Sequence, residues 1–296
     1  MRMLNAILGT LTIVIVHEIS KALYSNRVAT ISAWSTSLFS VFLISSSSIR
    51  GYSVMIFLCT LSIYLAMKLL ESGKLERRRL TIMLVSSMVM SSYTHYFGAM
   101  FSFLLYIFLV YKIYAKKNGF LEIIRLSAML GVLILPLFIA ILNFVQGGAG
   151  SMNDYIGQYV TFRFPYILVK NFLNGSNLLA IPFFLALFIR GIFWIQNEGK
   201  ISELIVKNEI LIFWLLAPLL FSSFISIIGP PIITPSNLSL SAPAISILIG
   251  KLVDDYLNEF DWFFPDMPYE KIFPILIISH LFLLYGITEH SRPDLE

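Results

Sequence analysis

Long apolar runs separated by short polar segments make up most of the chain. Ten runs reach or approach the roughly 17–25 residues that a helix needs to cross a bilayer. They cover residues 4–24, 28–45, 52–70, 80–93, 97–115, 121–144, 177–195, 209–228, 237–257 and 272–288. The pattern predicts an all-α, polytopic integral membrane protein with about ten transmembrane helices, which form a single transmembrane domain over residues 1–296.

Three longer segments connect these runs. Residues 145–176 combine a glycine-rich start with many aromatic side chains, a composition typical of a helix at the membrane interface. Residues 196–209 carry charges of both signs and predict a solvated inner linker. Residues 254–270 are acidic and aromatic, and we expect an inner loop that caps the membrane surface.

Composition supports a lipid environment. Hydrophobic residues are 57% of the chain and charged residues only 13%, against roughly 25% charged in a soluble domain. If ten helices alternate in direction, 16 of the 21 Lys and Arg fall on one side, and only Arg2, Arg50, Arg163, Lys170 and Arg292 fall on the other. Basic loops face the cytoplasm, so the pattern predicts a cell-membrane protein with both termini extracytoplasmic. The same uneven distribution of Lys and Arg explains the net charge of +4 without a nucleic-acid partner.

Several kinds of site are excluded or not indicated. The single cysteine, Cys59, excludes an internal disulfide and a multi-cysteine metal site. No zinc spacing, phosphate-binding glycine loop or nucleophile elbow occurs. We therefore identify no metal site and no cofactor, and the sequence leaves a divalent-cation requirement open.

The stretch from Ile49 to Gly98 predicts a helical hairpin. Two apolar runs are joined by a basic turn at residues 76–79. Their far ends therefore come to the same side of the membrane. We expect one outer surface that holds Arg50, Tyr52, Thr94, His95 and Tyr96.

The motifs resemble the GT-C superfamily of polytopic glycosyltransferases, in particular dolichyl-phosphate-mannose–protein mannosyltransferases and aminoarabinose transferases of the family 39/83 type. Five segments carry this resemblance: Arg2-Met-Leu-Asn-Ala-Ile-Leu-Gly9, Lys21-Ala-Leu-Tyr-Ser-Asn-Arg-Val-Ala29, Ser47-Ser-Ile-Arg-Gly-Tyr52, Tyr93-Thr-His-Tyr-Phe-Gly98 and Thr234-Pro-Ser-Asn-Leu-Ser-Leu-Ser-Ala-Pro-Ala244. The resemblance implies a GT-C-like membrane core. It also implies sugar transfer from a polyprenyl-phosphate-linked donor at the extracytoplasmic face, as in protein glycosylation.

The chain departs from the family pattern. Ser236 and Asn237 stand where the family has Arg-Tyr, and the acidic motif of the family's first outer loop has no counterpart. The segment from Ile287 to Asp294 resembles the linker into the family's outer domain. We therefore expect a fragment-like core with little or no activity alone. Three origins stay open: a split gene with a companion polypeptide that carries the missing N-terminal segment, a decayed copy, or a divergent short form.

Within this resemblance, each candidate residue has a role. Arg50 could bind a lipid phosphate with two parallel hydrogen bonds; Tyr52, Thr94, His95 and Tyr96 could assist it. Arg163 and Lys170 could hold the same lipid, although each of these groups also suits ordinary membrane lipids and their headgroups. Asp154 is the one outer-loop carboxylate between helices, and is the candidate general base.

Two functions of other classes stay open. A transporter or flippase for lipids or small molecules would need charged or broken helices at mid-membrane. A non-catalytic scaffold subunit would need neither. The sequence does not name the sugar, the acceptor or the oligomeric state.

Overall fold

The computed structural model describes residues 2–39, 51–115, 123–135, 185, 188, 201–228 and 237–263. Every element in these ranges is helical, which confirms the all-α class for this part of the chain. The elements are α1 (Arg2–Leu23), α2 (Asn26–Leu38), α4 (Tyr52–Glu71), α5 (Lys74–Thr94), α6 (Tyr96–Ala115), α10 (Ile201–Ile228), the 3-10 helix η1 (Asn237–Ser241) and α11 (Ala242–Phe263). A further apolar helix covers Ile123–Leu135.

Three described helices are long and apolar enough to cross a membrane: Met3–Leu23, Tyr52–Glu71 and Tyr96–Ala115. They match three of the ten predicted spans. Shorter apolar helices at Ile123–Leu135 and Asn208–Phe224 match two more in part. The predicted segments 145–176 and 272–288 lie outside the described residues, as does 177–195 except for the helical Leu185 and Phe188. The total of ten spans stays a prediction.

Three segments that the sequence predicts as a turn, a linker and a loop are wholly or partly helical in the structure. The basic residues 77–79 belong to the first turns of α5, and the chain reverses earlier, at Ser72 and Gly73. Residues 201–209 continue α10 rather than forming a linker. Residues 254–263 continue α11 rather than starting a loop. In each case a charged stretch was taken for a loop, yet Lys, Arg and Glu are good helix formers.

Two other predicted spans differ from the described helices. Helix α2 has 13 residues, too few to cross a bilayer by itself. The predicted span 237–257 begins as η1 and continues as α11, which carries charges in its second half.

The described contacts divide the chain into two compact units. Unit 1 holds residues 49–161 and 209–241, and unit 2 holds residues 2–48, 162–208 and 242–296. The single transmembrane domain over residues 1–296 stays a prediction.

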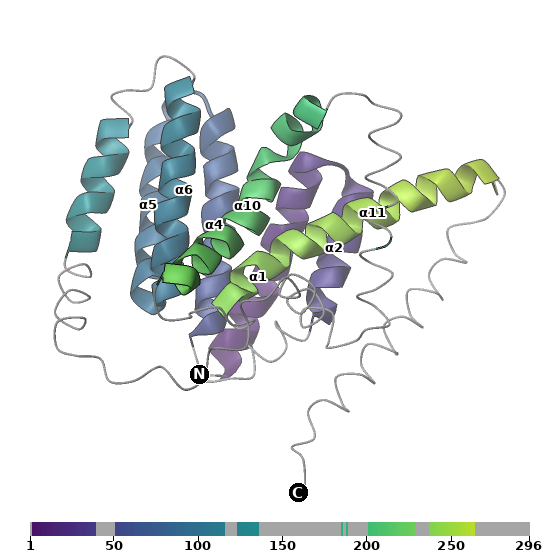
Figure 1. Ribbon diagram of the computed structural model, residues 1–296, viewed down its shortest axis with the longest axis horizontal. Coiled ribbons are helices and arrows are strands. Elements are labelled where there is room, and N and C mark those ends of the chain that lie inside the picture. Colours follow the sequence, from purple (N-terminus) through teal and green to yellow (C-terminus); the bar gives the residue numbers. More distant parts are fainter. Residues whose placement is uncertain are drawn as a thin grey trace, which may run out of the picture. The chain divides into compact units, whose positions relative to one another are not determined.

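Helix α4 forms the centre of unit 1. It packs against α5, α6 and η1, and α4, α5 and α6 run beside one another (Figure 1). In its apolar stretch 67% of the residues are buried inside the structure, compared with 39% for α6. Met55, Cys59 and Ile63 are fully buried. Helix α6 instead leaves much of its apolar surface for lipid.

Small polar side chains join α4 to α5. The Cys59 sulfur lies 3.2 Å from the Ser91 hydroxyl, and the hydroxyls of Ser62 and Ser87 are 2.8 Å apart. The later residue of α4, Ser62, contacts the earlier residue of α5, Ser87, so the two helices are antiparallel. This confirms the predicted hairpin. Small residues allow helix backbones to approach closely in lipid, where apolar contact gives little net attraction.

The contact between α5 and α6 is tighter still. A Cβ added to Gly98 would lie 2.2 Å from the Ser91 carbonyl oxygen. The Ser102 hydroxyl of α6 also donates to the Met88 carbonyl of α5, at 2.9 Å. Glycine at position 98 is therefore required by close approach between the helices.

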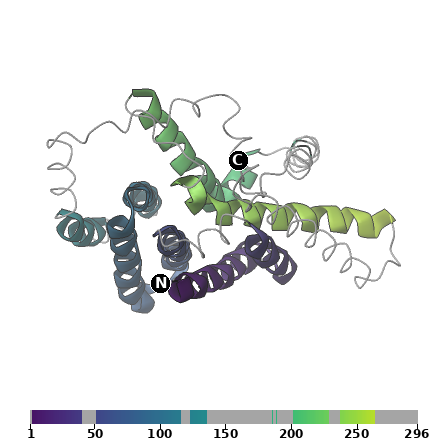
Figure 2. The ribbon, with the colours of Figure 1, turned by 90° about the horizontal axis from the view of Figure 1, so that it is seen from below.

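In unit 2, α11 lies along α2 and touches α1 (Figure 2). The Ser25 hydroxyl caps α2 by accepting from the Val28 N–H at 3.2 Å. Within the helix pair, the buried Thr36 hydroxyl lies 2.8 Å from the Ser246 hydroxyl. A Cβ added to Gly250 would lie 2.2 Å from the Ser32 oxygen. Small residues thus set this crossing too.

A network of polar and charged groups ties the α1–α2 turn to the C-terminal half of α11. Arg27 Nε lies 3.3 Å from Asp254 Oδ1, and Arg27 Nη1 donates to Asn258 Oδ1 at 3.0 Å. Lys251 pairs with Asp255 and lies over the ring of Tyr24. These contacts give charged side chains in the second half of α11 polar or charged partners.

Tyr24 belongs to the same network. Its hydroxyl donates to the Asn208 side-chain oxygen. Burial raises the pKa of Tyr24 to about 12, and the Asp255 carboxylate adds to this effect. Tyr24 is therefore a neutral hydrogen-bond donor at physiological pH.

We expect Gly98→Ala to destabilise the protein by about 2 kcal/mol, since overpacking forces the backbones apart. The measurement is the thermal unfolding midpoint of the purified protein in detergent. Gly131→Ala is the matched control, because a Cβ there meets nothing within 4 Å and alanine favours a helix. An equal or smaller loss for Gly98→Ala than for Gly131→Ala would show that the close contact is not required.

Removing one partner of the Arg27–Asp254 pair should also lower stability. Arg27→Gln leaves the Asp254 side chain, which is 13% exposed, without its cation, and we expect a loss of about 2 kcal/mol. The double variant Arg27→Gln/Asp254→Asn should lose less than the sum of the single variants, as measured by unfolding midpoints. Lys21→Gln, at an exposed cation, is the control. Strict additivity would contradict the coupling.

Candidate functional site

The free ends of the α4–α5 hairpin meet, as predicted. Gly51, which precedes α4, lies beside the end of α5: a Cβ built on it would be 3.7 Å from the Thr94 carbonyl oxygen. Tyr52 is the first residue of α4, and its ring centroid lies 5.1 Å from that of His95. The structure therefore brings together Tyr52, Thr94, His95 and Tyr96, the four predicted residues that it describes at this end.

His95 occupies the junction between α5 and α6 and caps both. Its backbone N–H donates to the Ser91 carbonyl at 3.3 Å, and its own carbonyl accepts from the Ala99 N–H at 3.1 Å. The Phe97 N–H donates to His95 Nδ1 at 3.2 Å, as to the side chain of an N-cap residue. Because Nδ1 must offer a lone pair, the neutral ring carries its proton on Nε2.

Burial favours this neutral ring. It lowers the pKa of His95 below the ordinary value of 6.5, since a partly desolvated imidazolium is costly. Protonation would also place a hydrogen on Nδ1, against the Phe97 N–H. At neutral pH, His95 therefore presents one N–H donor, at Nε2.

Aromatic rings surround His95. Tyr96 stacks on it with ring centroids 4.4 Å apart and an interplanar angle of 25°. Phe97, fully buried, anchors the start of α6. Tyr96 and the neighbouring Tyr93 are about half exposed, at 51% and 53%, which suits the membrane interface.

Thr94 can make fewer hydrogen bonds to a ligand than the sequence suggested. Its hydroxyl hydrogen is directed to the helix carbonyls of Met90 and Ser91, at 2.8 and 2.9 Å. The hydroxyl can therefore accept a hydrogen bond from a ligand but does not have its proton available to donate. As a phosphate-binding group, Thr94 is the weakest of the four.

The other candidate residues, Arg50, Asp154, Arg163 and Lys170, lie outside the described residues. The roles of all the site residues stay predictions. The sequence at this end, residues 51–59 and 91–99, contains no carboxylate. Its side chains can bind and orient an anion, but they include no carboxylate that could act as the base. Within the described ranges, no three His, Cys, Asp or Glu residues are grouped as metal ligands.

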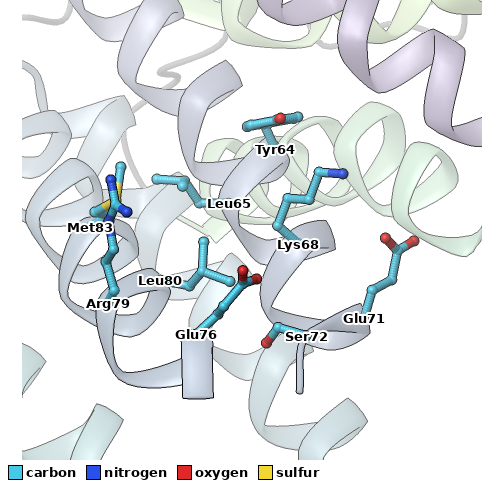
Figure 3. A pocket seen from close by; sticks show the side chains of 9 residues that line it. All are labelled: Tyr64, Leu65, Lys68, Glu71, Ser72, Glu76, Arg79, Leu80 and Met83. Atoms are coloured by element: carbon cyan, nitrogen blue, oxygen red, sulfur yellow. The ribbon is translucent and has the colours of Figure 1, made fainter. Parts of the chain in front are cut away.

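Sequence reasoning missed the opposite end of the hairpin. A cavity of about 450 Å³ opens there between α4 and α5, lined by charged side chains of both signs (Figure 3). In the sequence, the basic residues at this end predict only a turn between two apolar runs. Only the helical continuation of α5 places Glu76 and Arg79 opposite Lys68.

Comparison with solved structures identifies a shared architecture. The structure is similar to that of ArnT from Cupriavidus metallidurans in the apo state, with a TM-score of 0.58 and 15% sequence identity. The match covers 86% of this chain and 45% of that one. The chain has an ArnT-like fold.

At this level of identity the likeness shows the fold alone, and three of the described helices are long and apolar enough to cross a membrane. The chain spans about half the length of ArnT. No family model matches the sequence, and no curated protein matches it. The similarity to ArnT is therefore one of fold.

The cap at His95 predicts a pH dependence. The pKa of His95 is lower in the folded state than in the unfolded chain, so the folded state binds a proton at His95 less tightly. Stability from neutral His95 is thus fully present above about pH 6.5 and is lost as the pH falls through the folded pKa.

We expect the unfolding midpoint of the wild type to fall between pH 7.5 and pH 5 more steeply than that of His95→Asn, in which the asparagine oxygen keeps the cap without titrating. His17→Asn, at a partly exposed histidine on α1, is the comparison variant and should flatten the profile less than His95→Asn does. If His17→Asn flattened the profile and His95→Asn did not, the assignment to His95 would be wrong.

Proposed function

We propose that this chain is the membrane core of a GT-C-type glycosyltransferase that binds a polyprenyl-phosphate-linked sugar at the extracytoplasmic ends of α4 and α5. The observation that carries the proposal is the meeting of Tyr52 and His95 at one end of a hairpin. The likeness to ArnT supports it, since aminoarabinose transferases are among the proteins whose motifs the sequence resembles.

The chemistry of these groups suits a phosphate. Two neutral donors, the Tyr52 hydroxyl and the His95 Nε2–H, can bind phosphate oxygens without the desolvation cost of a buried cation. The guanidinium of Arg50, two residues before Tyr52, would add a charged, two-pronged donor. In sugar transfer the bond from the sugar carbon to the phosphate oxygen breaks, so these donors would stabilise the charge left on the leaving phosphate.

Transfer also needs a group that takes the proton of the acceptor hydroxyl. Asp154 is our candidate for that base. Weak or no activity of this chain alone is part of the proposal. The sugar and the acceptor are left open.

The sequence of the two central helices disfavours a transporter. No charged residue occurs from Ser53 to Met67 in α4 or from Phe97 to Tyr111 in α6. Transport pathways depend on polar or ionisable groups at mid-membrane.

Binding of the lipid alone tests the proposal without requiring activity. The dissociation constant of a long-chain polyprenyl phosphate for the purified protein in detergent is measured by native mass spectrometry. We expect Tyr52→Phe and His95→Asn each to weaken binding by roughly tenfold, the cost of one hydrogen bond to a charged group. Tyr111→Phe, an exposed tyrosine near the other end of α6, should leave binding unchanged.

A polyprenol without its phosphate serves as the ligand control and should bind weakly to every variant. Equal affinity for polyprenol and polyprenyl phosphate would refute phosphate recognition. Wild-type affinity in both Tyr52→Phe and His95→Asn would refute this location.

A further inference from the structure

The cavity at the closed end of the hairpin holds a balanced set of charges. Two cations, Lys68 and Arg79, and two carboxylates, Glu71 and Glu76, line its volume of about 450 Å³. All four residues are exposed. The cavity therefore has both signs of charge within reach of one small ligand.

These four side chains do not neutralise one another. Among the described residues, no ion pair joins any two of them. The Lys68 ammonium instead lies 5.7 Å from the centroid of the Tyr64 ring, over its face. Four charges around one cavity, without an ion pair among the described residues, are complementary to a ligand that itself carries one charge of each sign.

By position along the helices, the lining changes from mainly apolar to mainly charged, and the Lys68 ammonium reaches back over the Tyr64 ring. In α4, Leu65 lies about one turn closer to the middle of the membrane than Lys68. In α5, which runs the other way, Leu80 and Met83 lie on the membrane side of Arg79 and Glu76. Figure 3 shows Tyr64 and Leu65 at one end of the cavity and Glu76 and Ser72 at the other.

This order matches a phospholipid better than a soluble zwitterion. Acyl chains need an apolar wall toward the bilayer, and a headgroup needs charges at the water side. Met83 is 43% exposed, so the apolar wall is open to lipid. The excess of Lys and Arg at this end of the hairpin corresponds to the cytoplasmic leaflet.

We propose that the cavity binds the headgroup of phosphatidylethanolamine. The phosphate lies beside Lys68 and Arg79, and the ammonium lies beside Glu71 and Glu76. The acyl chains pass along Leu80 and Met83, which line the cavity and reach the surface. No bond is made or broken; the lipid fixes the closed end of the hairpin in its leaflet.

Headgroup chemistry separates this ligand from the other common phospholipids. The primary ammonium of phosphatidylethanolamine donates hydrogen bonds to carboxylates, whereas the quaternary ammonium of phosphatidylcholine has no N–H. Phosphatidylglycerol has no cation and places a net negative charge beside Glu71 and Glu76. The site should therefore prefer phosphatidylethanolamine over both.

Native mass spectrometry of the purified full chain tests this preference, with an equimolar mixture of the three lipids carrying identical acyl chains. We expect the wild type to retain phosphatidylethanolamine over phosphatidylcholine by about fivefold, within the range of partly exposed charge pairs. Glu71→Gln/Glu76→Gln should abolish that preference, and Arg79→Gln should weaken retention of all three lipids. Soluble phosphoethanolamine should not displace the bound lipid.

Two matched controls report on general effects of charge. Arg78→Gln removes the cation next to Arg79 in sequence, which does not line the cavity. Glu18→Gln removes a carboxylate of α1. Both should keep the wild-type preference, and unfolding midpoints check that each variant is folded.

Four results would overturn the proposal. The first is equal retention of phosphatidylethanolamine and phosphatidylcholine by the wild type. The second is a preference for phosphatidylglycerol, which would indicate a plain basic patch. The third is loss of the preference in Arg78→Gln as large as in the cavity variants. The fourth is displacement by soluble phosphoethanolamine, which would indicate a site for a soluble zwitterion instead of a phospholipid.

Discussion

Close packing of α4 against α5 through small polar side chains is the contact on which unit 1 depends. In a bilayer, two apolar helices gain little by leaving lipid for each other, so shape and short hydrogen bonds decide which faces meet. The contacts of Cys59 with Ser91 and of Ser62 with Ser87 decide this here. Larger side chains at these positions would separate the backbones and remove both contacts.

The same register determines what lies at the two ends of the hairpin. With Cys59 opposite Ser91, Tyr52 comes to His95 at one end, and Lys68 and Arg79 line one cavity at the other. The first end presents neutral donors and exposed aromatic rings. The second presents four charges around a cavity. One packing arrangement thus generates both an interface suited to a phosphate and an interface suited to a zwitterion.

Unit 2 is held by a different balance of interactions. Small residues again set the crossing of α2 and α11, through Ser32 and Gly250. Charged groups then fix the end of the pair, where Arg27 contacts both Asp254 and Asn258. Partly buried charges of this kind add little net stability when paired, but they are costly when one partner is removed. They therefore specify one arrangement of α11 on α2 over others.

The amino-acid sequence by itself determined the class of the protein, the spans at α1, α4 and α6, and the hairpin that joins Tyr52 to His95. A bilayer forces every backbone hydrogen bond to be made within a helix, so hydrophobic length and charge distribution are enough for these inferences. The sequence did not identify Lys74–Arg79 as the start of a helix, because a short charged segment between two apolar runs has the length and polarity of a loop.

Only the tertiary structure decided which face of each helix meets its neighbour. Helices α4 and α6 are apolar on all sides, so no periodic pattern marks the buried face. The capping role of His95, the contact of Gly98 with Ser91, and the pairing of Arg27 with the distant Asp254 depend on that choice. Side-chain packing between segments far apart in the sequence creates these contacts, and no local signal encodes them.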